Sequence, residues 1–109
     1  MDKKVCIITK GNFIYRKTQE KLVPDPDIML APHAPVSVLT AARGSDIQGG
    51  TAYMTFLCCP ECMKALGAAE IKKIVYQQER PAAVEEEAVS RDIADYFEIE
   101  LVHNPEIEL

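Results

Sequence analysis

The residues of this chain that could carry chemistry are one histidine and a pair of cysteines with metal-ligand spacing. His33 follows a proline-rich stretch, and Cys59 and Cys62 stand in the run Cys-Pro-Glu-Cys. Imidazole nitrogen and thiolate sulfur are ligands that zinc prefers, and three protein ligands leave a fourth tetrahedral position for water or substrate. The pattern therefore predicts a zinc site of the catalytic kind.

Two residues beside these ligands are weaker candidates. Cys58 adjoins a ligand, and neighbouring side chains of an extended segment point in opposite directions, so we expect a packed thiol rather than a fourth ligand. Glu61 is either a replacement acid/base or an acidic residue in a first helical turn. The helix dipole favours the second interpretation.

Three more polar residues are considered as site residues. Asp25 and Asp27 lie among prolines in a loop expected near the metal, where aspartates usually form turns, so they are weak candidates for catalysis or ligation. His103 lies near the C-terminus, beyond the last expected strand. We expect it to be exposed and outside the site.

The elements that must position these residues can be located from the apolar pattern. Buried strands are predicted over 5–9, 51–57, 71–76 and 99–102, and a return strand begins at 13–15. Helices are predicted over 34–43, 60–70 and 85–97, with Pro35 and Pro60 tolerated in first turns. Within the last helix, Glu85–Glu87 are expected to be a solvated start, whereas the helical spacing predicts a core face formed by Val89, Ile93, Tyr96 and Phe97.

This order, ββαβαβαβ, predicts an α/β fold with parallel pairing among the later strands. We expect a three-layer α/β/α arrangement around a mixed, five-stranded sheet. With 109 residues and no break in composition, residues 1–109 are expected to form one domain.

Composition excludes several classes of function. The formal net charge is −5, which disfavours non-specific binding to nucleic acid, although a basic N-terminal cluster leaves local nucleotide contact open. The N-terminal apolar run is too short for a signal peptide or a membrane span, so we expect a cytoplasmic protein. In a reducing compartment the later cysteines favour metal binding over disulfides, and Cys6 is expected in the core.

These features together resemble the zinc-dependent cytidine and deoxycytidylate deaminases, whose signature is H-x-E followed by P-C-x-x-C. Here the matching stretches are His33-Ala34-Pro35 and Cys58-Cys59-Pro60-Glu61-Cys62, with further similarity at 50–55 and 71–76. The resemblance implies a cytidine deaminase-like fold, zinc held by His33, Cys59 and Cys62, and a pyrimidine nucleotide ligand. In the family, zinc activates water and a glutamate moves the proton.

The chain departs from this pattern at four places. Pro35 replaces the glutamate, Cys58 replaces the proline before the first cysteine, and 16–22 contains no match to the substrate-contacting asparagine. The family's first helix is also missing. These departures predict a zinc-binding protein that is catalytically silent or very weak. Two alternatives stay open: a dCMP-type deaminase with a relocated carboxylate (Glu61, Asp25 or Asp27), or an interaction module with structural zinc.

The missing helix also bears on assembly. Without it, Val5, Ile7, Phe13, Tyr15 or their alternating neighbours would face water, because side chains alternate along a strand. Large apolar patches are uncommon on monomers. We therefore expect a homo-oligomer, or a protein partner, bound through the face beside the first two strands.

Overall fold

The structure, a computed structural model, describes residues 3–10, 13–20, 35, 38–39, 47–79 and 83–109. Pro35, Val38 and Leu39 have helical backbone, within the helix predicted over 34–43. The other elements are β1 (Lys3–Lys10), β2 (Phe13–Glu20), β3 (Thr51–Phe56), α2 (Pro60–Ala68), β4 (Lys73–Gln78), α3 (Val84–Tyr96) and β5 (Glu100–His103).

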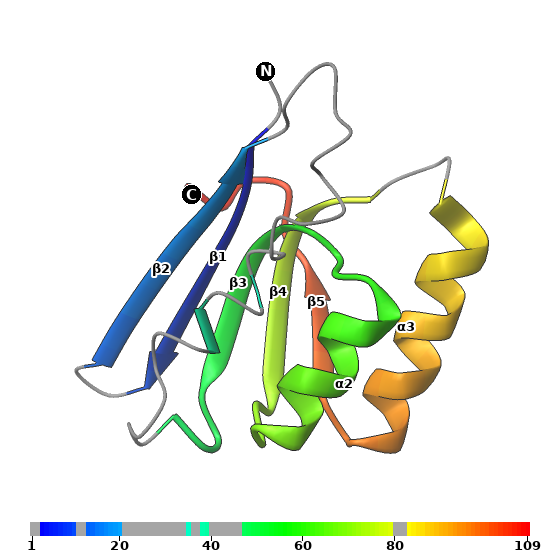
Figure 1. Ribbon diagram of the computed structural model, residues 1–109. Coiled ribbons are helices and arrows are strands. Elements are labelled where there is room, and N and C mark those ends of the chain that lie inside the picture. The colour runs from blue at the N-terminus through cyan, green and yellow to red at the C-terminus, as the bar shows by residue number, and fades with distance from the viewer. Residues whose placement is uncertain (1–2, 11–12, 21–34, 36–37, 40–46, 80–82) are drawn as a thin grey trace.

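The sheet runs in the order β2-β1-β3-β4-β5 (Figure 1). β1 pairs antiparallel with both β2 and β3, whereas β3, β4 and β5 are parallel neighbours. The predicted α/β class, the mixed sheet and the parallel pairing of the later strands are confirmed. The parallel strands end at one edge of the sheet, and the chain leaves that edge to enter α2 and then α3.

Both helices cover the same face of the sheet (Figure 1). Each follows one parallel strand and precedes the next, and right-handed crossovers that advance in one direction put their helices on one side. Among the described ranges no helix covers the opposite face. Of the predicted three-layer arrangement, the described residues therefore show two layers, the sheet and one layer of helices.

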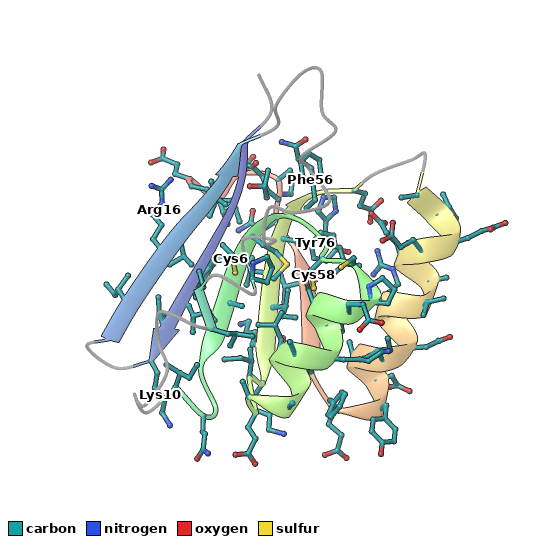
Figure 2. All side chains as sticks on the ribbon, in the orientation of Figure 1. Cys6, Lys10, Arg16, Phe56, Cys58 and Tyr76 are labelled. Carbon is teal, nitrogen blue, oxygen red and sulfur yellow. The ribbon has the colours of Figure 1, made fainter. Side chains whose placement is uncertain are left out.

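The core lies between the sheet and this layer, and alternation along the strands builds it. Cys6 and Ile8 of β1 have no exposed surface, and Met54 of β3 and Tyr76 of β4 are buried on the same side. Figure 2 shows Cys6, Cys58 and Tyr76 gathered in this space, with Arg16 at the outer edge. The prediction that Cys6 is a core residue is confirmed.

The start of β4 was predicted two residues too early. Ile71 lies in the turn after α2, where its N–H donates to the carbonyl of Leu66 (3.1 Å) and its side chain is fully buried. Glu70 turns the chain there with a φ of 63°. Helix-terminal hydrogen bonds therefore hold an apolar residue that the sequence pattern assigned to the strand.

The core face predicted for α3 is correct for Ile93 and Phe97, which pack partly buried against the core, and wrong for Val89 and Tyr96. Its buried residues are Glu87, Ser90 and Ala94. Val89 of the predicted apolar face is 49% exposed and Tyr96 is 81% exposed. The apolar residues Ile93 and Phe97 lie toward α2, whereas Val89 and Tyr96 lie toward solvent.

The face opposite the helices carries the C-terminal segment. Arg16 and Gln77 occupy the strand positions that point away from Cys6 and Tyr76, and they donate to the carbonyls of Leu109 and Ile107. Figure 1 shows the chain end beside the first two strands. On this face Val5 is buried, and Ile14 is 70% exposed. Self-association through this face stays a prediction.

Gly67 provides a test of how α2 packs on α3. A Cβ atom built there would lie 2.4 Å from two ring carbons of Phe97. Overpacking costs about 1–3 kcal/mol, and helix propensity returns up to about 1 kcal/mol, so Gly67→Ala is expected to lower the free energy of unfolding by about 1–2 kcal/mol. Denaturant melts measure it. The loss should shrink when Phe97→Leu is already present, and a more stable Gly67→Ala protein would contradict the packing.

Candidate metal centre

The two cysteines of the predicted site lie at the N-terminus of α2. Cys59 is the residue that precedes the first turn, with extended backbone (φ −66°, ψ 164°), and Pro60 is the first helical residue. Proline suits that position because its fixed φ is helical and its missing N–H has no partner to lose. Cys62 follows in the first turn, so both thiols project from one helix end.

The electrostatics of the pair depend on the contact between the two sulfur atoms. A side-chain hydrogen bond with Cys59 raises the pKa of Cys62 above its ordinary value, and burial raises it further. A bound cation stabilises thiolates and releases their protons. Two mutually hydrogen-bonded thiols at a helix end are a donor set that fits zinc.

The third predicted ligand, His33, lies outside the described residues, as do Asp25 and Asp27. Within the part of the chain that the structure describes, no three His, Cys, Asp or Glu side chains group as a metal site. The three-ligand set therefore stays a prediction, and the structure describes two of its members, Cys59 and Cys62.

The structure describes Pro35, which the sequence resemblance aligns with the family's glutamate. It has helical backbone and is buried. A buried pyrrolidine ring has no titratable group and no N–H. The side chain at this position therefore cannot accept or donate a proton.

Cys58 is buried in the core rather than turned to solvent. Its carbonyl accepts a hydrogen bond from the hydroxyl of Ser90 in α3 (2.8 Å), and Ser90 has no exposed surface. α3 is thereby tied to the segment that leads into the cysteine pair. This location agrees with a packed thiol, and whether Cys58 ligates a metal stays open.

Glu61 points to solvent. Its side chain is 83% exposed and pairs with Lys64 one turn later (3.0 Å). Glu61 is thus an acidic residue of the first turn, as the dipole argument indicated.

Glu87 was missed at the level of sequence. It was expected on a solvated helix start, yet only 6% of it is exposed. Glu87 lies three residues before Ser90 on the same face of α3, and therefore about 5 Å along the helix from the residue that bonds Cys58. Glu87 has helical spacing with Ser90 and Ala94, the other buried residues of α3. This signal was easy to miss because Glu87 is also the last of three consecutive glutamates.

A second polar cluster lies at the carboxyl ends of β4 and β5. Tyr76 and His103 are register partners, and their rings stack at 5.0 Å with an interplanar angle of 12°. Arg91 of α3 donates to the hydroxyl of Tyr76 (3.0 Å) and pairs with Glu79 (3.4 Å). His103 therefore ends β5 instead of following it, and 41% of its side chain is exposed.

Comparison with known proteins decides the family. The family model of the cytidine and deoxycytidylate deaminase zinc-binding region matches residues 4–78, which is more than half of the chain. The chain belongs to this family. The predicted resemblance is confirmed, and the matched region includes Pro35, Cys59 and Cys62.

Individual relatives agree with the family and with its fold. Over 41 residues the chain is 51% identical to deoxycytidylate deaminase of Enterobacteria phage T2, a match that covers 37% of this chain and 22% of the relative. Deoxycytidylate (dCMP) deaminase of cyanophage S-TIM5, in complex with dCMP and dUMP, has a TM-score of 0.70 at 19% identity, covering 92% of this chain and 79% of that one.

A third match is to a larger protein. Acinetobacter baumannii RibD has a TM-score of 0.73 at 26% identity, and the alignment covers 92% of this chain and 28% of that one. The matched region spans about a fifth of the length of the phage T2 relative. Family and fold follow from these matches, and activity and ligand are matters for proposal.

The described residues contain no helix long and apolar enough to cross a membrane.

Proposed function

We propose that this protein is a zinc-binding member of the deaminase family that turns over pyrimidine nucleotides very slowly or not at all. The observation that supports this most is Pro35, buried in helical backbone where the family carries its proton-transferring glutamate. In this proposal the chain keeps the family's metal ligands but lacks the group that transfers protons.

The metal-binding half would consist of His33, Cys59 and Cys62. Cys59 and Cys62 are already hydrogen-bonded to one another at the start of α2, so their sulfur atoms need little rearrangement to share a cation. When bound, zinc supplies Lewis-acid activation of water in this family. Burial of Cys62, which is 1% exposed, would shield one metal–sulfur bond from solvent.

The proton-moving half has no replacement at its own position. A positioned acid/base group contributes about 10²–10⁴-fold to a rate, so its loss slows turnover severely. Glu61, between the two thiols in sequence, is directed to solvent and paired with Lys64. It is poorly placed to act toward a ligand on the buried side of the cysteine pair.

One observation favours the alternative of an active dCMP-type deaminase with a relocated carboxylate. Glu87 is buried at the start of α3, on the face whose next turn bonds the carbonyl of Cys58. Carboxylates that act as general acids are commonly buried in their active sites. Among the described residues, Glu87 is the best-placed carboxylate for that role, ahead of Glu61.

The test is ammonia release from cytidine, deoxycytidine and their monophosphates by the unaltered, zinc-loaded chain. We expect no more than a small fraction of the roughly 1–10³ turnovers per second typical of enzymes. A parallel binding titration with dCMP separates a silent nucleotide-binding protein from an interaction module with structural zinc. Ordinary turnover would overturn the proposal, and its loss in Glu87→Gln would then establish the relocated carboxylate.

A further inference from the structure

All the cysteines of the chain lie close together, around Cys62. Cys59 forms a side-chain hydrogen bond with the Cys62 thiol, and Cys6 and Cys58 are near enough to act on it electrostatically. Cys6, Cys58 and Cys62 are buried, whereas Cys59 is only partly buried. An oxidant in solution therefore meets this cluster at Cys59.

The start of α2 brings the sulfur atoms of Cys59 and Cys62 together. Cys59 has extended backbone and precedes the first turn, and Cys62 is the third residue of the helix. A side chain in the first of these positions reaches toward the residue three positions later, as in a helix capping box. Cys59 makes no capping hydrogen bond to the backbone, and its contact is with the sulfur of Cys62 instead.

This arrangement is close to the geometry of a disulfide. Bridged cysteines usually have Cα atoms about 4.4–6.8 Å apart and sulfur atoms about 2 Å apart. Residues three apart in a helix have Cα atoms about 5 Å apart, which meets the first condition. Rotation about the Cα–Cβ bond of the partly buried Cys59 meets the second. Pro60 already holds the intervening backbone in the helical conformation, so closure requires little movement of α2.

We propose that Cys59 and Cys62 form a thiol–disulfide redox site that exchanges with low-molecular-weight disulfides such as oxidised glutathione. The sulfur of Cys59 attacks one sulfur of the glutathione disulfide, whose S–S bond breaks, and one glutathione leaves with the proton of the Cys59 thiol. Cys62 then attacks the sulfur of Cys59 and displaces the second glutathione, which takes the second proton. In sum, two protein thiols and one glutathione disulfide give one protein disulfide and two reduced glutathione molecules.

The disulfide and zinc would exclude one another, and this part of the proposal rests on the proposed zinc-binding function. Zinc binds cysteine as the thiolate, and a sulfur in a disulfide is no longer a thiolate. A sulfur held by zinc is likewise withdrawn from exchange. Oxidation would therefore release the metal, and reduction would restore the pair as ligands.

The test is incubation of metal-free and zinc-loaded chain with oxidised glutathione, followed by alkylation of the remaining thiols and intact-mass measurement. At least about half of the metal-free chain should lose two thiols and retain no glutathione, and the zinc-loaded chain should do so at least about tenfold less. The equilibrium constant for closure should also be at least about tenfold larger in the folded metal-free chain than in guanidinium chloride, because contact between the sulfur atoms raises their effective concentration.

Variants identify the pair. Cys6→Ser and Cys58→Ser remove buried thiols outside it and should still lose two thiols. Cys59→Ser should lose none. Cys62→Ser should retain one glutathione, bound to Cys59, because the thiol that would displace it is gone. Circular dichroism melts verify that the metal-free chain and each variant are folded.

Four results would overturn the proposal. The first is a metal-free chain that keeps all of its thiols, and the second is a disulfide that persists in Cys59→Ser. The third is equal closure in the folded and denatured chain, and the fourth is equal oxidation of metal-free chain and of chain shown by elemental analysis to hold zinc. A chain that binds no zinc would contradict the proposed function alone, because the metal-free measurements decide the disulfide by themselves.

Discussion

Cys62→Ser is expected to reduce the zinc content of the purified protein from about one ion per chain to nearly none. A serine hydroxyl cannot replace the thiolate in a tetrahedral site with sulfur and nitrogen ligands. Cys62 is also 1% exposed and packed in the core, so the metal–sulfur bond would lie within the fold. We expect a loss of several kcal/mol in stability, because metal bound only by the native state adds its binding free energy to folding.

Elemental analysis and thermal melts with and without chelator measure this prediction together. Chelator should destabilise the unaltered protein strongly and the Cys62→Ser protein hardly at all. Cys58→Ser and Cys6→Ser are the matched controls, because both residues are buried core thiols of the same size. Both of these variant proteins should retain about one zinc ion per chain. Unaltered protein, purified without chelator, that contains no metal would falsify the zinc proposal.

Pro35→Glu is expected to raise the rate of dCMP deamination by about 10²–10⁴-fold over the unaltered chain, the range that a positioned acid/base contributes. The substitution is compatible with the backbone, because Pro35 is already helical and glutamate is a good helix former. It returns a titratable group two residues after His33. An ammonia-release assay with zinc-loaded protein measures the change.

Pro35→Gln is the control for this substitution. Glutamine has nearly the shape of glutamate and the same helical compatibility, but it cannot exchange a proton, so it should leave the rate near that of the unaltered chain. A folded, zinc-loaded Pro35→Glu protein without any gain would contradict the prediction. It would show that the chain lacks more than its glutamate, such as residues that hold the nucleotide.

Burial inside α3 shows where sequence patterns failed and why. Val89, Ile93, Tyr96 and Phe97 have helical spacing, and spacing alone predicted them to face the core. Ile93 and Phe97 do pack against the core, but Val89 and Tyr96 are exposed. The residues that α3 buries most completely are Glu87, Ser90 and Ala94. Hydrophobic periodicity indicates that a helix has an apolar stripe, whereas the orientation in which the helix packs decides how much of that stripe is buried. The same orientation of α3 buries Glu87.

Relations between distant segments were equally inaccessible. Tyr76 and His103 meet because β4 and β5 are parallel in a particular register, and nothing local to either residue specifies that register. Ser90 meets the carbonyl of Cys58 for a similar reason, since the contact joins α3 to the segment that leads into α2. Each is a long-range consequence of how the sheet is ordered.

The sequence by itself determined the α/β class, the order of elements, the parallel later strands, the position of the cysteine pair at a helix start and the family. Each of these depends on local signals: alternation, helix-breaking residues and a motif whose spacing is set within a few residues. Only the tertiary structure decided how much of the apolar stripe of α3 is buried and where Glu87 lies. Those features depend on the distance and orientation between packed elements, which are set by the whole core rather than by any one segment.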